Sequence, residues 1–112
     1  FYCGCTRLIT RDHGNATTYL DRLGREIARQ GALFDTDRPA VQLHLGGGTP
    51  NFLSIDELER LTGLLADHFN LEMADDRDYS IELDPRYLEP GFIGALAELG
   101  FNRVSFGVQD LD

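Results

Sequence analysis

Apolar and polar residues alternate with a period of two in three short segments, residues 41–46, 79–84 and 103–109. In each segment one set of alternate positions is apolar, and the other set is small or polar. This pattern predicts three strands, each with one face suited to a hydrophobic core and one suited to polar contacts. The small or polar positions are Gln42, His44, Gly46, Ser80, Glu82, Asp84, Ser105, Gly107 and Gln109.

A helical period precedes each predicted strand. Residues 15–34 carry an imperfect apolar stripe, residues 55–65 a regular one, and residues 90–99 a short one that ends before Gly100. Ser54 and Glu57 have the spacing of a capping box at the start of the second helix, and residues 70–78 are expected to form an acidic loop after it. The stripes consist of Tyr19, Leu20, Leu23, Ile27, Leu33, Ile55, Leu58, Leu61, Leu64, Leu65, Phe92, Ile93, Leu96 and Leu99.

The predicted order is therefore αβαβαβ, in which each helix returns the chain so that the next strand runs parallel to the last. A sheet covered by helices on both sides tends to be apolar on both faces. One apolar and one polar face instead predict an α/β fold with a barrel-like parallel sheet, whose polar side holds a ligand. The polar strand ends, near residues 46–49, 82–84 and 109–110, are then expected to meet at one rim.

Three glycines, Gly46, Gly47 and Gly48, follow the first strand, and Thr49 and Pro50 come next. Because glycine has no Cβ, the backbone at these positions can touch a ligand directly. A strand, a glycine loop and a helix in this order are typical of ligand sites at the carboxyl ends of strands in α/β proteins. A tight structural turn is the alternative interpretation, and we favour the ligand loop.

The length and composition fit one small globular domain, with 112 residues that are 42% hydrophobic and 26% charged. A net charge of −9 argues against broad binding to nucleic acid or anionic membranes, because both need positive charge against phosphate. Cys3 and Cys5 lie too close for an ordinary structural disulfide, so a disulfide-stapled secreted module is not expected. The chain starts on bulky aromatic residues without Met, from which we expect a fragment that begins inside a motif.

The expected rim suits a ligand that donates hydrogen bonds from amino and hydroxyl groups, because it combines glycine backbone, two carboxylates and a carboxamide. Phosphate is a weaker interpretation, since the loop has no Lys and matches neither the Walker-type nor the G-x-G-x-x-G pattern. For Glu82 the alternative is a structural ion pair with Arg86 or Arg103. For Gln109 the alternative is a hydrogen bond to the backbone at the end of its strand.

Four motifs along the chain point to one family. They are Phe1-Tyr2-Cys3-Gly4-Cys5, Leu43-His44-Leu45-Gly46-Gly47-Gly48-Thr49-Pro50, Ser80-Ile81-Glu82-Leu83-Asp84-Pro85 and the segment from Phe101 to Asp110. In their order and spacing the chain resembles the radical S-adenosylmethionine enzymes and, within them, the family of oxygen-independent coproporphyrinogen III oxidases, along essentially all 112 residues. The resemblance implies a partial (β/α)6 barrel of the TIM type. Residues 1–112 would be part of the radical S-adenosylmethionine core domain, without the C-terminal substrate-binding domain.

The cofactors implied by this resemblance are a [4Fe–4S] cluster and S-adenosylmethionine. Cys3 matches the third thiolate of the family's C-x3-C-x2-C cluster motif, whose first two cysteines would precede Phe1; thiolates match iron in softness and charge. Cys5 matches an additional cysteine that is not a regular cluster ligand. The positions that contact S-adenosylmethionine in the family match Tyr2 near the adenine, Gly47 at the methionine end, Gly48 and Thr49 at a second molecule, Glu82 near the ribose hydroxyls, and Gln109.

The activity implied by the resemblance is radical oxidative decarboxylation of the small molecule coproporphyrinogen III to protoporphyrinogen IX, in haem biosynthesis. We expect it in the cytoplasm, with electrons from a donor protein and without nucleic-acid or membrane partners. No catalytic side chain is expected beyond the groups that bind the cofactors. A haem chaperone of the same superfamily is one alternative, against which Cys5 counts, and a non-catalytic nucleotide-binding α/β module is another.

Overall fold

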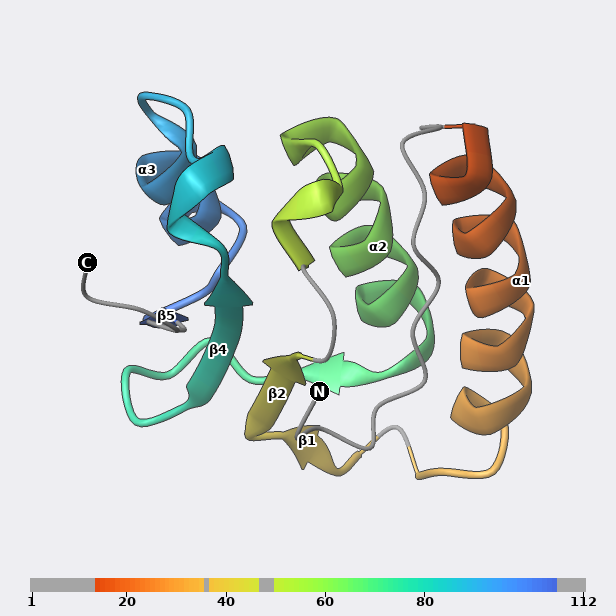
Figure 1. The fold of residues 1–112 in the computed structure, drawn as a ribbon. Coiled ribbons are helices and arrows are strands. Elements are labelled where there is room, and N and C mark those ends of the chain that lie inside the picture. Colours follow the sequence, from red (N-terminus) through yellow and green to blue (C-terminus); the bar gives the residue numbers. More distant parts are fainter. Residues whose placement is uncertain (1–13, 36, 47–49, 107–112) are drawn as a thin grey trace, which may run out of the picture.

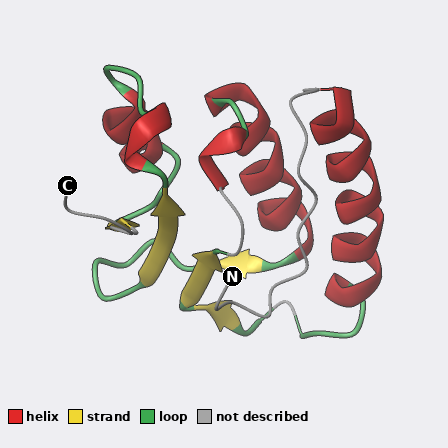
Figure 2. Ribbon diagram, in the orientation of Figure 1, coloured by secondary structure: helices red, strands yellow, loops and turns green. Residues whose placement is uncertain are grey.

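Three α-helices alternate with parallel strands in the computed structural model, which describes residues 14–35, 37–46 and 50–106 (Figure 1). The helices are α1 (Gly14–Gly31), α2 (Ile55–His68) and α3 (Phe92–Glu98). The strands are β1 (Pro39–Ala40), β2 (Gln42–Leu45), β3 (Asn70–Leu71), β4 (Asp78–Leu83) and β5 (Arg103–Phe106). Two short 3-10 helices, η1 (Pro50–Phe52) and η2 (Pro85–Tyr87), come after β2 and β4 along the chain (Figure 2). The predicted αβαβαβ order is confirmed, with β1 and β3 as an added pair.

All the strand pairs in the described residues are parallel. β4 is the central strand of the order β2–β4–β5, and β1 pairs separately with β3. The stretch expected to be an acidic loop, residues 70–78, thus begins with a short strand. That strand, β3, pairs with β1, whereas β2 pairs with β4. The change of partner falls at Val41, whose carbonyl accepts a hydrogen bond of 2.8 Å from the backbone N–H of Asp78.

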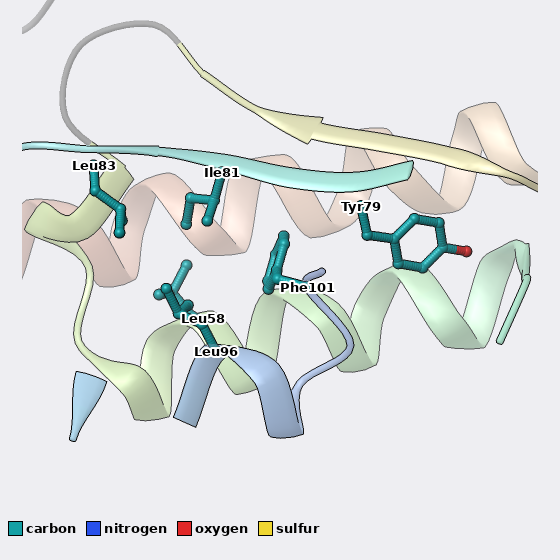
Figure 3. Packing of buried hydrophobic residues seen from close by; sticks show 6 residues of the cluster. All are labelled: Leu58, Tyr79, Ile81, Leu83, Leu96 and Phe101. Atoms are coloured by element: carbon teal, nitrogen blue, oxygen red, sulfur yellow. The ribbon is translucent and has the colours of Figure 1, made fainter. Parts of the chain in front are cut away.

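The main core lies on one side of β4, where Tyr79, Ile81 and Leu83 point toward α2 and α3 (Figure 3). Ile81 has no exposed surface, and neither has Leu58 of α2. Burying an aliphatic side chain of this size stabilises a fold by about 1.5–3 kcal/mol, so this cluster fixes which face of β4 is inward. The predicted apolar face of β4 is confirmed, whereas Val41 before β2 and Val104 and Phe106 of β5, which were also predicted to face the core, are exposed. The buried cluster consists of Leu58, Tyr79, Ile81, Leu83, Leu96 and Phe101.

Local sequence determines where the second and third helices begin and end. The predicted capping box of α2 is confirmed: Ser54 Oγ accepts from Glu57 N at 3.2 Å, and Glu57 Oε1 accepts from Ser54 N at 2.9 Å. Gly100 follows the end of α3 with a φ of 108°, in the left-handed region that favours glycine, as the predicted terminator requires. Both helices pack over the same face of β4, through Leu58 of α2 and Leu96 of α3.

The helices bury less apolar surface than their sequence stripes suggest. α1 packs on α2 through Leu20, Ile27 and Leu61, which form a second, smaller cluster. Tyr19 in α1 is 58% exposed, and Leu33 lies beyond the helix, which ends at residue 31 rather than 34. Ile93 of α3 is also exposed, so these three positions were wrongly predicted to face the core. None of the helices in the described residues is long and apolar enough to cross a membrane.

Candidate cofactor-binding site

A histidine on β2 and two residues of β4 form a hydrogen-bonded group on the polar side of the sheet. The strand register places His44 opposite Ser80. The Nδ1 atom of His44 lies 2.7 Å from the Oγ atom of Ser80, and its Nε2 atom lies 3.2 Å from the Oε1 atom of Glu82. We call these three residues the histidine bridge, because one imidazole ring connects a hydroxyl and a carboxylate of the neighbouring strand.

The histidine bridge runs from the interior of the sheet to its accessible rim. Ser80 is buried, whereas the side chains of His44 and Glu82 are 53% and 47% exposed. Glu82 is also the penultimate residue of β4, near the carboxyl end of the central strand. Parallel α/β sheets bind ligands at this end of their strands, so the carboxylate stands where a ligand is expected.

Gly46 makes room for the histidine bridge. A Cβ atom at this position would lie 2.5 Å from His44 Nε2 and 3.0 Å from Glu82 Oε1. Ordinary non-bonded contacts of carbon are about 3.5–4.0 Å, so any side chain here would push the imidazole or the carboxylate aside. The sequence pattern suggested ligand contact for all three glycines of the loop. For Gly46 the structure gives a different reason for the absence of a side chain, which is the space taken by His44 and Glu82.

Two arginine–carboxylate pairs lie on either side of the bridge along β4. Arg86 binds Asp84 through its Nε atom at 3.0 Å and its Nη2 atom at 2.6 Å, while its backbone N–H donates to the same carboxylate and so caps η2. These hydrogen bonds from Arg86 hold the pKa of Asp84 below its usual range. Arg103 donates to Asp78 Oδ2 at 3.2 Å. Each arginine considered as a partner for Glu82 therefore binds a neighbouring carboxylate, and Asp84 serves as a helix cap.

The whole chain aligns with proteins of one name. Over all 112 residues it is 48% identical to the oxygen-independent coproporphyrinogen III oxidase of Pseudomonas aeruginosa. Over the same length it is 42% identical to the proteins of that name from Synechocystis sp. and from Escherichia coli. The chain is a homologue of one segment of oxygen-independent coproporphyrinogen III oxidase. It spans 24% of the length of these relatives. No protein-family model matches the chain.

The fold agrees with this oxidase family. The chain matches coproporphyrinogen III oxidase HemN from Escherichia coli, a radical SAM enzyme, with a TM-score of 0.89 and 43% sequence identity. The match covers 98% of this chain and 25% of that protein. The resemblance stated from the sequence is thereby confirmed. The expectation of parallel strands from a partial radical S-adenosylmethionine barrel is consistent with this neighbour.

Glu82 is the one residue in the described part of the chain that the resemblance to the oxidase family placed at a cofactor. Within the described ranges, no group of three or more His, Cys, Asp or Glu side chains could hold a metal ion. The predicted cluster ligand is outside those ranges, so the metal site stays a prediction. The predicted site residues outside the described residues are Tyr2, Cys3, Gly47, Gly48, Thr49 and Gln109.

His44 is the site residue to which the sequence assigned no role. The alternation along β2 placed it on the same face as Gln42 and Gly46, which was the available signal. Its contact with Glu82 depends on the register between two strands separated by the whole of α2. Sequence periodicity within one strand does not contain that register, so the histidine bridge appears only in the folded chain.

Proposed function

We propose that this chain is a segment of an oxygen-independent coproporphyrinogen III oxidase, which converts coproporphyrinogen III to protoporphyrinogen IX by oxidative decarboxylation. The observation that carries the proposal is the 48% identity to the Pseudomonas aeruginosa oxidase over all 112 residues of the chain. Because the chain spans 24% of that relative, residues 1–112 would form part of the radical S-adenosylmethionine core domain. The substrate-binding domain would lie elsewhere in the complete enzyme, by which we mean the longer protein that contains this chain.

The described residues fit the ribose end of S-adenosylmethionine. Two ribose hydroxyls are hydrogen-bond donors, and an accessible carboxylate at the carboxyl end of a central strand is a strong acceptor for them. Glu82 has this position and is 47% exposed. In this proposal Glu82 accepts from the ribose, and the residues that complete the cofactor site are Tyr2, Gly47, Gly48, Thr49 and Gln109.

The chemistry of the reaction would come from the cofactors, and the protein would bind and orient them. When bound, a [4Fe–4S] cluster supplies the electron with which S-adenosylmethionine chemistry begins. Cys3 would provide one thiolate to that cluster. The glycine backbone after β2 and the Glu82 carboxylate would fix the position of the nucleoside, so that its reactive end meets the substrate in one orientation.

The test is an assay of the complete enzyme, purified without oxygen and reconstituted with iron and sulfide. Supplied with a reductant, S-adenosylmethionine and coproporphyrinogen III, it should release methionine and form protoporphyrinogen IX. Tight haem binding without conversion would instead identify a haem chaperone. Binding of ATP in preference to S-adenosylmethionine would identify a nucleotide-binding module and would refute the proposal.

Location and partners belong to the same proposal. We expect the complete enzyme in the cytoplasm, with coproporphyrinogen III as its small-molecule substrate and a donor protein as its source of electrons. The net charge of −9 over this chain supports the expectation that neither nucleic acid nor an anionic membrane is a partner.

A further inference from the structure

We propose that His44 is a positioning residue, which holds the Glu82 carboxylate in the orientation that receives the ribose of S-adenosylmethionine. The proposal rests on the proposed function and deepens it, because it names the group that orients a predicted cofactor ligand. The observation behind it is the histidine bridge, in which one imidazole touches Ser80 Oγ at 2.7 Å and Glu82 Oε1 at 3.2 Å.

The chemistry of the three groups fixes how protons are shared in the histidine bridge. An ionised carboxylate can only accept hydrogen bonds, so the Nε2 atom of His44 carries the proton that faces Glu82. In the neutral ring, Nδ1 is then an acceptor, and the Ser80 hydroxyl can donate to it. Because Ser80 is 7% exposed and lies inside the central strand, it anchors the ring on its buried side. The Glu82 carboxylate therefore selects the tautomer whose N–H points at it, and the Ser80 hydroxyl, which can donate or accept, adapts to that tautomer.

The exposure of the histidine bridge argues that it serves orientation more than folding. The side chains of His44 and Glu82 are about half exposed, and hydrogen bonds between such groups contribute little to stability because water competes for them. A carboxylate has two oxygens and about four acceptor positions. The contact at Oε1 restricts the rotation of the Glu82 carboxylate and occupies one of these acceptor positions.

The backbone is also shaped for this contact. Gly46 lies beyond His44 on the same strand face, and a Cβ there would stand 2.5 Å from His44 Nε2. A side chain at this position would therefore displace the His44 ring or the Glu82 carboxylate from the contact. A glycine that serves the histidine–glutamate contact, at the start of the predicted ligand loop, connects the bridge to the proposed cofactor site.

The test compares two substitutions of His44 in the complete enzyme. In His44→Gln the amide nitrogen reaches about as far as Nε2 and can still donate to Glu82. In His44→Asn the amide reaches only about as far as Nδ1, so the contact with Ser80 can form and the contact with Glu82 is lost. The probe is S-adenosylhomocysteine, which is not cleaved, measured by titration calorimetry beside its 2′,3′-dideoxy analogue. Melting temperatures of both variants control for folding.

We expect His44→Asn to weaken S-adenosylhomocysteine binding by about three- to tenfold, the range of one ordinary hydrogen bond, and His44→Gln to retain most of the affinity. His44→Asn should also reduce the preference for the ribose over the dideoxy analogue, which a merely structural role would leave unchanged. Equal losses in both variants with the preference intact, or normal affinity in both, would overturn the proposal. If His44→Asn fails to fold, Ser80→Ala removes the anchor of the imidazole instead. Unchanged affinity and unchanged preference for the ribose in that variant would also overturn the proposal. The wild-type assay is independent of these outcomes, so a failure of the positioning role is distinguished from a failure of the proposed oxidase activity.

Discussion

Replacing Glu82 by Gln tests whether the carboxylate at the end of β4 binds the cofactor. The substitution keeps the size and shape of the side chain, and its amide oxygen can still accept a hydrogen bond from His44 Nε2, now 3.2 Å from Oε1. What is lost is the negative charge. If that charge strengthens hydrogen bonds from two ribose hydroxyls, its removal should weaken cofactor binding far more than it weakens the fold.

The expected loss of cofactor affinity and the expected loss of stability differ in size. A hydrogen bond to a charged group contributes about 1.5–3 kcal/mol, which corresponds to a roughly ten- to hundredfold weaker dissociation constant for S-adenosylmethionine. The contact between His44 and Glu82 joins side chains that are 53% and 47% exposed. Exposed pairs contribute about 0.2–1 kcal/mol, so the free energy of unfolding should change by less than about 1 kcal/mol.

The assay measures both quantities on the complete enzyme, with calorimetric titration of S-adenosylmethionine and a thermal or denaturant unfolding curve. Glu98→Gln is a matched control, because Glu98 is an exposed residue at the end of α3, away from the strand. The control should leave affinity and stability unchanged. Unchanged affinity in Glu82→Gln, together with a lowered melting temperature, would remove Glu82 from the cofactor site and leave it a structural partner of His44.

Four further substitutions test other parts of the structure. Gly46→Ala should disrupt the histidine bridge and weaken cofactor binding about as much as His44→Asn, which titration of the cofactor checks. At Gly63 a Cβ meets nothing within 4 Å, so Gly63→Ala should stabilise α2 by about 0.5–1 kcal/mol, which unfolding curves check. Tyr79→Phe should cost about 1–2 kcal/mol, because the phenol donates to Ala40 O and accepts from Glu72 N, both at 2.6 Å. Burial raises the pKa of Tyr79 above 10.0, so the neutral phenol's contribution is complete below pH 10 and is lost as the pH rises; unfolding curves of Tyr79→Phe should lack this alkaline loss. Hydrogen bonds from Arg86 lower the pKa of Asp84 below 3.8, so their stabilisation is present above that pH and is lost as the pH falls further; Arg86→Ala should move acid unfolding to higher pH, and an unmoved acid transition would contradict the pair.

Much of the fold could be predicted because it depends on local patterns. The alternation of apolar and polar residues predicted the inward face of β4 correctly, since side chains alternate across any strand regardless of its neighbours. The capping box at Ser54 and the terminator at Gly100 were predictable for the same reason, because each is a contact or a dihedral angle within a few residues. The errors lie where a local pattern does not determine burial. Tyr19 and Ile93 fit helical stripes but are exposed, because the described residues place no partner element over them.

The sequence by itself determined the order of the helices and main strands, the inward face of β4 and, through its motifs, the resemblance to the oxidase family. It could also place Glu82 on the polar face. Only the tertiary structure decided which groups that carboxylate meets. The register between β2 and β4 brings Ser80 opposite His44, so that the ring reaches Glu82, while Arg86 and Arg103 bind other carboxylates. The physical reason is that periodicity fixes the direction of a side chain within its own strand, whereas its partners depend on how strands separated by a whole helix are aligned.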